Sequence, residues 1–312
     1  MPIIIILSLL IIIFVISYIA YKMAFYNDPN KEIDLYDSPV VANDESCKKV
    51  MNSLIDEFKV IPYEEICITS FDGLKLKAKY YHLDDKAPIQ IQCHGYKGCG
   101  IRDMSGGNKL AREANYNTLV ISHRAHDGSG GNSITFGIKE RQDVLSWVNY
   151  LNERFPSQNE IILVGVSMGA ATVLMCSELD LPSNVKAIIA DCPYDDIKQE
   201  IKVFIKKMKL TPTILYPFVY LGAFIFAKFK INETSPLQAV KNSKVPILLI
   251  HGEEDDVVPL HMSNNIYNAN KEKVEYHTFK NAKHGLSYII DPKRYEEIAL
   301  NFLNKHLTTK QK

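Results

Sequence analysis

The sequence carries no excess of charge of either sign, and its cysteines show no regular spacing. Lys and Arg together number 36, as do Asp and Glu. Without a basic stripe or a recognition module, we expect no nucleic-acid partner. No C-x-x-C pair occurs and no histidine stands at metal-ligand spacing, so a zinc site is not predicted. We expect buried free thiols rather than disulfides at the six cysteines, which are Cys47, Cys67, Cys93, Cys99, Cys176 and Cys192.

Charged side chains are also missing from residues 2–21, a stretch rich in Ile and Leu. About 20 apolar residues match the thickness of a bilayer core, so residues 1–22 are predicted to be a transmembrane anchor. A secretory signal peptide is the alternative, but it would have a basic start, a shorter apolar run and a small-x-small cleavage site. We therefore expect an uncleaved single-pass anchor in the cell membrane. Lys22 and Lys31 favour the cytoplasmic side for the domain that follows, although the side stays open.

The rest of the chain divides into a polar linker and one α/β domain. Residues 23–60 are predicted to form a linker with a helix over 43–59, and residues 61–312 the domain. Short β-rich runs alternate there with helical patterns, which indicates βαβ units and a mostly parallel sheet. Strands are expected at 65–70, 74–82, 89–93, 118–122, 161–164, 187–191, 246–250 and 274–279. Helices are expected at 103–114, 138–154, 168–178, 261–269 and 292–306.

Residues 194–240 interrupt this alternation, because they are much longer than an ordinary connection between a strand and a helix. They contain a basic amphipathic run at 197–210 and an uncharged run at 216–227, which is too short to span a bilayer. We expect a helical insertion that serves as a lid over a substrate cleft. A helix pair that is merely packed onto the domain is the alternative.

The segment Gly165-Val166-Ser167-Met168-Gly169 has the pattern G-x-S-x-G. The pattern alone is weak, but a predicted strand precedes it and a predicted helix follows it. A serine on so sharp a turn needs small neighbours on both sides, and the two glycines provide them. We therefore interpret Ser167 as a candidate nucleophile; an ordinary glycine-rich turn is the alternative.

A serine hydroxyl needs a base to take its proton and an acid to orient that base. Downstream of Ser167, a row of carboxylates at 253–256 follows one predicted strand, and His284 follows the last one. Both segments would lie at the carboxyl edge of a parallel sheet, where open α/β folds bind ligands. His284 is the candidate base, since His277 lies within a strand and His306 in a polar terminal helix.

A tetrahedral intermediate also needs two N–H donors aimed at its oxyanion. We expect one from the backbone of Met168, which follows the serine, and the other from the glycine-rich loop at 94–100. Tyr96 N–H is the predicted second donor, with a plain glycine-rich turn as the alternative for that loop.

Together these segments resemble the α/β-hydrolase superfamily. The motifs that carry the resemblance are H-G-x at 94–96, the nucleophile elbow at 165–169, H-G-x-x-D-x-x-V-P at 251–259 and K-H-G at 283–285. Within the superfamily the chain is similar to bacterial membrane-anchored hydrolases of the lysophospholipase and serine-aminopeptidase-like group, as the segment at 134–141 also indicates. The resemblance covers about residues 60–306. It implies an α/β-hydrolase fold, in which helices flank a mostly parallel eight-stranded sheet and a helical lid is inserted.

The resemblance also implies the role of each site residue. The register of the motif at 251–259 makes Asp255 the acid, with Glu254 and Asp256 as fallback candidates. Ser167, His284 and Asp255 would then form a triad that cleaves an ester, thioester or amide through an acyl-enzyme. Such chemistry requires neither a metal nor an organic cofactor.

The sequence leaves three functions open. An esterase acting on a carboxylester or a lipid ester is favoured by the anchor and the apolar insert. A serine peptidase of the aminopeptidase type would hold a substrate amine with acidic residues of the insert, where Glu200 is one candidate. A membrane-tethered binding protein on a hydrolase fold is disfavoured by the intact Ser, Asp and His positions. One departure from the group's R-x-H-G-x-S turn is Asp127, which stands where glycine is expected.

Overall fold

A computed structural model describes residues 2–155 and 159–308 of the chain. Residue 1 of the expected anchor 1–22, and residues 156–158 and 309–312 of the expected domain 61–312, lie outside the described residues. Its centre is an eight-stranded sheet in the order β1-β2-β4-β3-β5-β6-β7-β8. The β1–β2 and β2–β4 pairs are antiparallel and all other neighbours are parallel. The strands are β1 (Glu64–Thr69), β2 (Lys75–Tyr81), β3 (Ile89–Cys93), β4 (Asn117–Ile121), β5 (Ile161–Val166), β6 (Val185–Asp191), β7 (Ile247–Gly252) and β8 (Val274–Phe279). This confirms the expected mostly parallel sheet, with every expected strand present.

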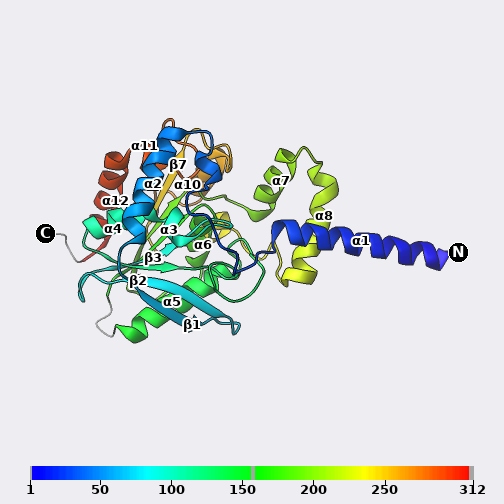
Figure 1. Cartoon of the computed structure of the whole chain (residues 1–312), viewed down its shortest axis with the longest axis horizontal. Helices are drawn as coiled ribbons and strands as arrows, with labels where there is room; N and C mark the ends of the chain where they lie inside the picture. Colours follow the sequence, from blue (N-terminus) through cyan, green and yellow to red (C-terminus); the bar gives the residue numbers. More distant parts are fainter. Residues whose placement is uncertain (1, 156–158, 309–312) are drawn as a thin grey trace.

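Helices cover both faces of the sheet (Figure 1). On one face, α5 (Glu140–Arg154) and α6 (Met168–Cys176) pack against the strands through residues such as Trp147 and Leu174. On the other face, α4 (Ser105–Glu113) and α12 (Pro292–His306) do so through Leu110 and Phe302. Because both faces are covered, inner strands such as β5 and β7 are largely apolar runs, and in β3 the alternating Gln90 and Gln92 are buried as well.

The remaining helices are short or peripheral. Where one helix is expected over 103–114, the structure has two, because the backbone leaves helical geometry at Met104. These remaining helices are η1 (Pro39–Val41), α2 (Glu45–Lys59), α3 (Gly100–Asp103), α9 (Pro236–Lys241), α10 (Leu260–Ala269) and α11 (Ser287–Ile290).

Five of the six free cysteines are buried, but Cys67 is exposed on the edge strand β1, so the expectation of burial is wrong there.

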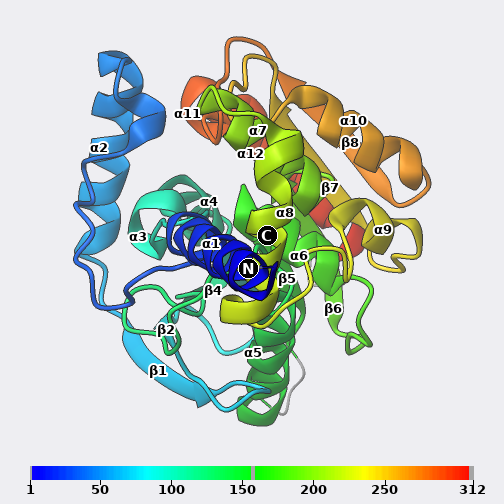
Figure 2. The same cartoon turned by 90° about the vertical axis from the view of Figure 1, so that its right-hand side faces the viewer.

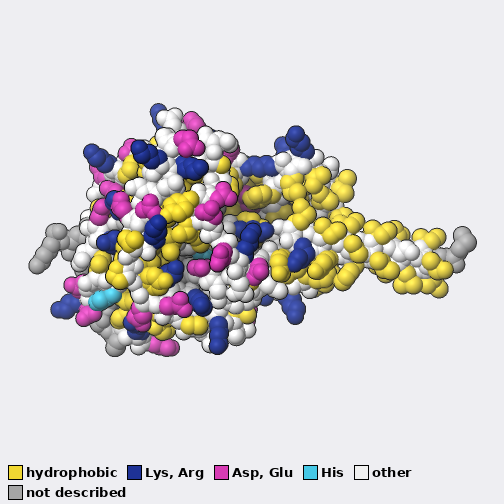
Figure 3. Space-filling model, viewed as in Figure 1, with side chains coloured by type: hydrophobic (Ala, Val, Ile, Leu, Met, Phe, Trp, Pro, Cys, Tyr) yellow, Lys and Arg dark blue, Asp and Glu magenta, His cyan; other side chains and the backbone are white. Residues whose placement is uncertain are grey.

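The N-terminal helix and the insertion project together from one side of the domain. Helix α1 (Pro2–Ala24) is long and apolar enough to cross a membrane, and its side chains are mostly exposed (Figure 3). The insertion forms α7 (Ile197–Lys207), α8 (Pro212–Gly222) and the π-helical turn η2 (Ala223–Ala227). Helix α8 packs against α1, and the two lie side by side in both views (Figures 1 and 2). Just beyond α1, Phe25 is fully buried against the domain.

The loop with the unexpected aspartate is held by a buried ion pair. Arg124 donates to both carboxylate oxygens of Asp143 at 2.7 Å, and both side chains are almost fully buried. Asp127 has a φ of 45°, and aspartate is one of the few residues besides glycine that adopt this left-handed conformation. Asp127 therefore occupies the position without requiring a different backbone shape.

Replacing Asp143 with alanine is expected to lower the free energy of unfolding by about 3 kcal/mol, because Arg124 would keep only its second partner, Asp72. Urea unfolding of the full chain in detergent, followed through the fluorescence of buried Trp147, measures the change. A loss below about 1 kcal/mol would show that the pair contributes no more than a surface ion pair.

Candidate active site

Ser167 lies on a sharp turn between β5 and α6. Its φ of 55° and ψ of −118° are unusual for any residue other than glycine. A Cβ atom on Gly165 would lie 2.3 Å from the backbone of Gly169, and one on Gly169 would lie 2.1 Å from the carbonyl oxygen of Cys93. Both glycines are therefore required for β5, the turn and α6 to pack this closely against β3, and the hydroxyl of Ser167 is lifted above the sheet edge.

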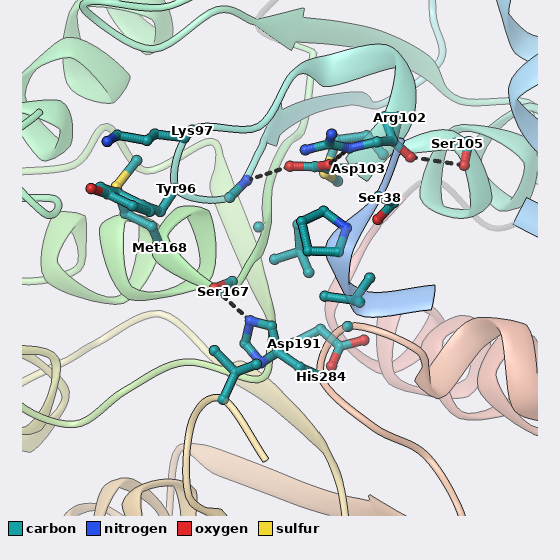
Figure 4. Close-up of a pocket in the computed structure, with 18 of the residues that line it drawn as sticks. Ser38, Tyr96, Lys97, Arg102, Asp103, Ser105, Ser167, Met168, Asp191 and His284 are labelled. Carbon is teal, nitrogen blue, oxygen red and sulfur yellow. Dashed lines mark hydrogen bonds and ion pairs between the residues drawn. The ribbon is translucent and has the colours of Figure 1, made fainter. Parts of the chain in front are cut away.

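The structure brings Ser167, His284 and Asp255 together from three different loops. Nε2 of His284 lies 2.8 Å from Oγ of Ser167, and Nδ1 lies 2.7 Å from Oδ2 of Asp255. Figure 4 shows the side chains of Ser167 and His284 pointing toward one another, with a dashed line marking their hydrogen bond. Since a carboxylate only accepts hydrogen bonds, Nδ1 of His284 is the donor, which leaves Nε2 free to accept the proton of Ser167.

Asp255 receives more donors than the sequence indicates. Its Oδ1 accepts the backbone N–H groups of Val257 and Val258, both at 2.8 Å. Its Oδ2 lies 3.1 Å from Nε2 of His251. Burial alone would raise the pKa of Asp255, but the hydrogen bonds from His251 and His284 outweigh it and hold the pKa well below its usual range. The carboxylate is therefore ionised at neutral pH, opposite His284.

His251 was not assigned a role from the sequence, although it opens the motif that supplied Asp255. Its Nε2 also contacts the carbonyl oxygen of Val258 at 3.0 Å, so this nitrogen carries the proton. Its Nδ1 accepts from the hydroxyl of Ser263 at 2.6 Å. A Cβ atom on the next residue, Gly252, would lie 2.2 Å from the carbonyl oxygen of Ala282, so glycine lets the loops that carry Asp255 and His284 approach.

The two expected oxyanion donors lie at the same cavity as Ser167. Tyr96 and Met168 line the same cavity as Ser167, and within the described residues neither backbone N–H donates a hydrogen bond to the protein. The loop before Tyr96 is fixed by Asp103, whose carboxylate accepts the N–H of Gly95 at 3.0 Å (Figure 4). A Cβ atom on Gly95 would lie 3.5 Å from Cβ of Ser167, so the loop passes directly beside the serine.

A cavity of roughly 800 Å³ opens onto Ser167 and His284. Linker residues such as Asn27 and Ser38 line one part of it, and Glu200 and Phe204 of α7 line another. Within the described chain, one group of ligand atoms is close enough for a metal, that of Cys192, Asp255 and His284. Asp255 and His284 already bond to one another, and burial raises the pKa of the Cys192 thiol well above its usual range. A protonated thiol is a poor metal ligand, so the group fits proton transfer better.

Two buried carboxyl groups line this cavity, those of Asp191 and Glu200. Burial raises the pKa of Asp191, whose carbonyl oxygen accepts the N–H of Ser167, to about 6. Burial also raises the pKa of Glu200 to about 8; the charge of Lys207 opposes this rise, and those of Asp255 and Asp195 add to it. Among the described residues, Oε2 of Glu200 has no hydrogen-bond partner. At neutral pH the side chain of Glu200 is therefore mostly protonated, and it lies in the wall of the cavity with one oxygen that has no hydrogen-bond partner among the described residues.

Replacing Glu200 with glutamine is expected to stabilise the protein increasingly as the pH rises. Its pKa is raised in the folded state, so the stability that its protonated form contributes is full below the unfolded pKa, about 4.3, and is lost as the pH rises through about 8. The gain should be on the order of 1 kcal/mol at pH 5 and about 4 to 5 kcal/mol at pH 8. Thermal unfolding of the parent and of Glu200→Gln at both pH values measures it. Exposed Glu254→Gln is the control, and parallel pH curves for parent and Glu200→Gln would contradict the assigned protonation.

The family model described as "Prolyl oligopeptidase family" matches residues 133–310, more than half of the chain. The chain belongs to the prolyl oligopeptidase family. Its sheet and flanking helices form the α/β-hydrolase fold that the sequence predicts. The matched part contains the elbow at Ser167 together with Asp255 and His284, but not the loop with Tyr96.

Curated relatives are distant in sequence. Protein YqkD of Bacillus subtilis is 23% identical over 81% of this chain and 83% of its own length. Protein bem46 of Schizosaccharomyces pombe is 24% identical over 77% and 76%. The lysophosphatidylserine lipase ABHD12 of Rattus norvegicus is 24% identical over 62% of this chain and 48% of its own length. The first two relatives therefore share most of their length with this chain.

Solved structures share the fold. Esterase Pf2001 of Pyrococcus furiosus superposes with a TM-score of 0.67 and 22% identity, covering 91% of this chain and 99% of that one. A puromycin-hydrolyzing peptidase of Mycobacterium tuberculosis superposes with a TM-score of 0.64 and 17% identity, covering 81% and 40%. Both an esterase and a peptidase thus have this architecture, so the fold alone does not select the substrate.

Proposed function

We propose that the protein is a membrane-anchored serine hydrolase that cleaves carboxylic esters through an acyl-enzyme. The observation that carries the proposal is the hydrogen-bonded chain from Oγ of Ser167 through His284 to Asp255, built on a strained turn. A strained serine paired with an oriented histidine is the arrangement that nucleophilic catalysis requires. The same arrangement argues against the tethered binding protein, which would have no need for it.

In the proposed reaction, His284 takes the proton from Ser167 as Oγ attacks the ester carbonyl carbon. The oxyanion accepts hydrogen bonds from the N–H groups of Tyr96 and Met168. The tetrahedral intermediate expels the alcohol, which receives the proton from His284. Water, deprotonated by His284, then attacks the acyl-enzyme and releases a carboxylic acid with free Ser167. Asp255 stays ionised throughout and stabilises the imidazolium form of His284.

The cavity supports an ester with an apolar part. Near Ser167 it is walled by the aromatic rings of Tyr96, Phe136, Tyr194 and Phe204, and Tyr96 stacks on Phe136 with ring centroids 5.1 Å apart. An acyl chain fits such a wall better than a charged peptide does. Two similar proteins named above, an esterase and a lysophosphatidylserine lipase, act on esters by their names.

Membrane anchoring is proposed from the way α1 continues into the domain. Beyond α1, Phe25 is buried between Phe136 and Phe229, with ring centroids 5.8 and 5.3 Å away. The hydroxyl of Tyr96 donates to the carbonyl oxygen of Ala24 at 2.9 Å. Cleavage of the segment as a signal peptide would remove contacts made by the loop that carries the oxyanion donor. An uncleaved anchor keeps them.

A serine peptidase of the aminopeptidase type is the second candidate, favoured by Glu200. The positive charge of a substrate ammonium group would lower the pKa of this carboxyl, which would release its proton to water and accept a hydrogen bond from the ammonium at the unpartnered oxygen. The family's own description as oligopeptidases is compatible with that activity.

A substrate panel separates the two candidates. The full chain in detergent is assayed with p-nitrophenyl esters of increasing chain length and with p-nitroanilides of alanine and leucine. We expect a higher kcat/KM for the esters than for the anilides. A preference for the anilides that disappears in Glu200→Gln would contradict the esterase proposal and support the peptidase.

A further inference from the structure

The anchor helix and the insertion form one apolar unit. A Cβ atom on Gly222, at the end of α8, would lie 2.6 Å from the carbonyl oxygen of Ser17 in α1. Ser17 is fully buried and Tyr21 nearly so by this contact. Small residues that let two helix backbones approach are typical of helix pairs within membranes.

The contact extends along α1 rather than touching it at one point. The ring of Phe226 in η2 meets Phe14 and Tyr18, each with centroids 5.2 Å apart, and Tyr21 at 5.5 Å. Residues 14–21 make about two helical turns, or roughly 10 Å of the axis of α1. The insertion therefore contacts α1 along its C-terminal half, and Figure 1 shows α8 crossing α1 at the end nearest the domain.

These contacts fix the depth of the insertion once α1 spans a bilayer. The charge-free stretch, residues 2–21, is 20 residues long and is needed in full to cross a core about 30 Å thick. The contact with α8 and η2 begins at Phe14, well inside that stretch. The two elements therefore cannot remain in bulk water while α1 spans.

The composition of the insertion matches that depth. Residues 212–227 contain no charged side chain, and Ile214, Phe224 and Ile225 are 63%, 52% and 42% exposed. Figure 3 shows hydrophobic side chains continuing from α1 onto the insertion, with Lys and Arg at its margins. Residues 197–230 hold seven lysines and a single acidic residue, the buried Glu200. Lysines beside an apolar surface suit anionic lipid headgroups.

We propose that α8 and η2 insert into the same bilayer as α1, with the lysines of α7 among anionic headgroups, and that Ser167 receives amphiphilic esters from that bilayer. The proposal rests on the anchored hydrolase proposed above and names its substrate class. The cavity lies between Asn27 and Asp28, just after α1, and Glu200 and Phe204 of α7. An ester with its acyl chain in the membrane would thus meet the cavity beside the anchor.

Tryptophan fluorescence tests the depth directly. The chain has one tryptophan, Trp147, which is fully buried in the domain and serves as an internal reference. Phe224→Trp, Ile11→Trp and Val60→Trp are each reconstituted in vesicles of phosphatidylglycerol and phosphatidylcholine brominated in its acyl chains. We expect bromine to quench the added emission in the first two variants, but not in Val60→Trp or in the parent.

The outcomes distinguish the two proposals. Quenching in Ile11→Trp without quenching in Phe224→Trp would overturn the entry of α8 and η2 into the bilayer, while α1 would still be a membrane anchor. Absence of quenching in Ile11→Trp would show that α1 does not span the bilayer, and would overturn the entry of α8 and η2 into it as well.

Activity supplies the second readout. Phe224→Asp/Ile225→Asp is compared with Val60→Asp, which places a charge on an exposed apolar residue at the end of α2, outside the insertion. For each, the rate on a long-chain monoacylglycerol in vesicles is divided by the rate on soluble p-nitrophenyl acetate. We expect the ratio to fall at least about tenfold in the lid variant, because each aspartate opposes insertion, and to match the parent in the control. An unchanged ratio in the lid variant would contradict delivery from the bilayer.

Discussion

Replacing Ser167 with alanine is expected to lower kcat for ester hydrolysis by about 10⁴- to 10⁶-fold, because Oγ is the atom that accepts the acyl group. What remains would come from the oxyanion donors and from substrate binding. The variant should fold like the parent, since the hydroxyl makes its side-chain hydrogen bond to His284 and the backbone of the turn is held by Gly165 and Gly169.

Ser177→Ala is the matched control for this prediction. Ser177 is a buried serine just beyond the C-terminus of α6, and its hydroxyl donates to the carbonyl oxygen of Leu174. Steady-state hydrolysis of p-nitrophenyl butyrate should be retained in this control and lost in Ser167→Ala. Equal activity of the two variants would show that the nucleophile lies elsewhere.

Replacing Asp255 with asparagine is expected to lower kcat by about 10⁴-fold at neutral pH. The amide oxygen would still accept the N–H groups of Val257 and Val258, so the amide nitrogen would point toward His284 and His251. Nδ1 of His284 would then accept a hydrogen bond, which places the proton on Nε2 and leaves no base for Ser167. The predicted loss of activity therefore comes from the wrong tautomer of His284, while the loop keeps its geometry.

The same substitution should also change how the free energy of unfolding depends on pH in acid. Because the pKa of Asp255 is depressed in the folded state, its contribution is present above the unfolded pKa, about 3.9, and is lost as the pH falls below that value. Unfolding of Asp255→Asn should therefore depend less steeply on pH below about 4 than unfolding of the parent. Exposed Asp256→Asn is the control for both measurements. A larger loss of activity in Asp256→Asn would move the acid to this fallback position.

Much of the fold could be predicted because its signals are local. A strand buried on both faces is a short, largely apolar run, as in β5 and β7, and the eight strands separated by helical patterns leave few arrangements of a parallel sheet. The turn at Ser167 could be predicted for a related reason. Its two glycines are required by contacts with residues close in sequence or on the next strand, so the spacing itself carries the information.

Other features depend on contacts between distant segments and leave no local pattern. The packing of Gly222 against Ser17 joins residues about 200 positions apart, and neither residue is unusual for its own helix. The donation from His251 to Asp255 follows from a register that only the folded loops define. The hydrogen bond from the N–H of Gly95 to the carboxylate of Asp103 likewise depends on how the folded loop is arranged. Asp127 appeared to be a departure in sequence, but its left-handed φ shows that the backbone is the one glycine would adopt.

Covalent labelling tests the central claim, that Ser167 is a nucleophile activated by His284. The full chain in detergent is treated with a fluorophosphonate, digested, and analysed by mass spectrometry to locate the phosphonylated residue. The adduct is predicted on Ser167, absent from Ser167→Ala and strongly slowed in His284→Ala. An adduct on another residue, or undiminished labelling of Ser167→Ala, would contradict the account.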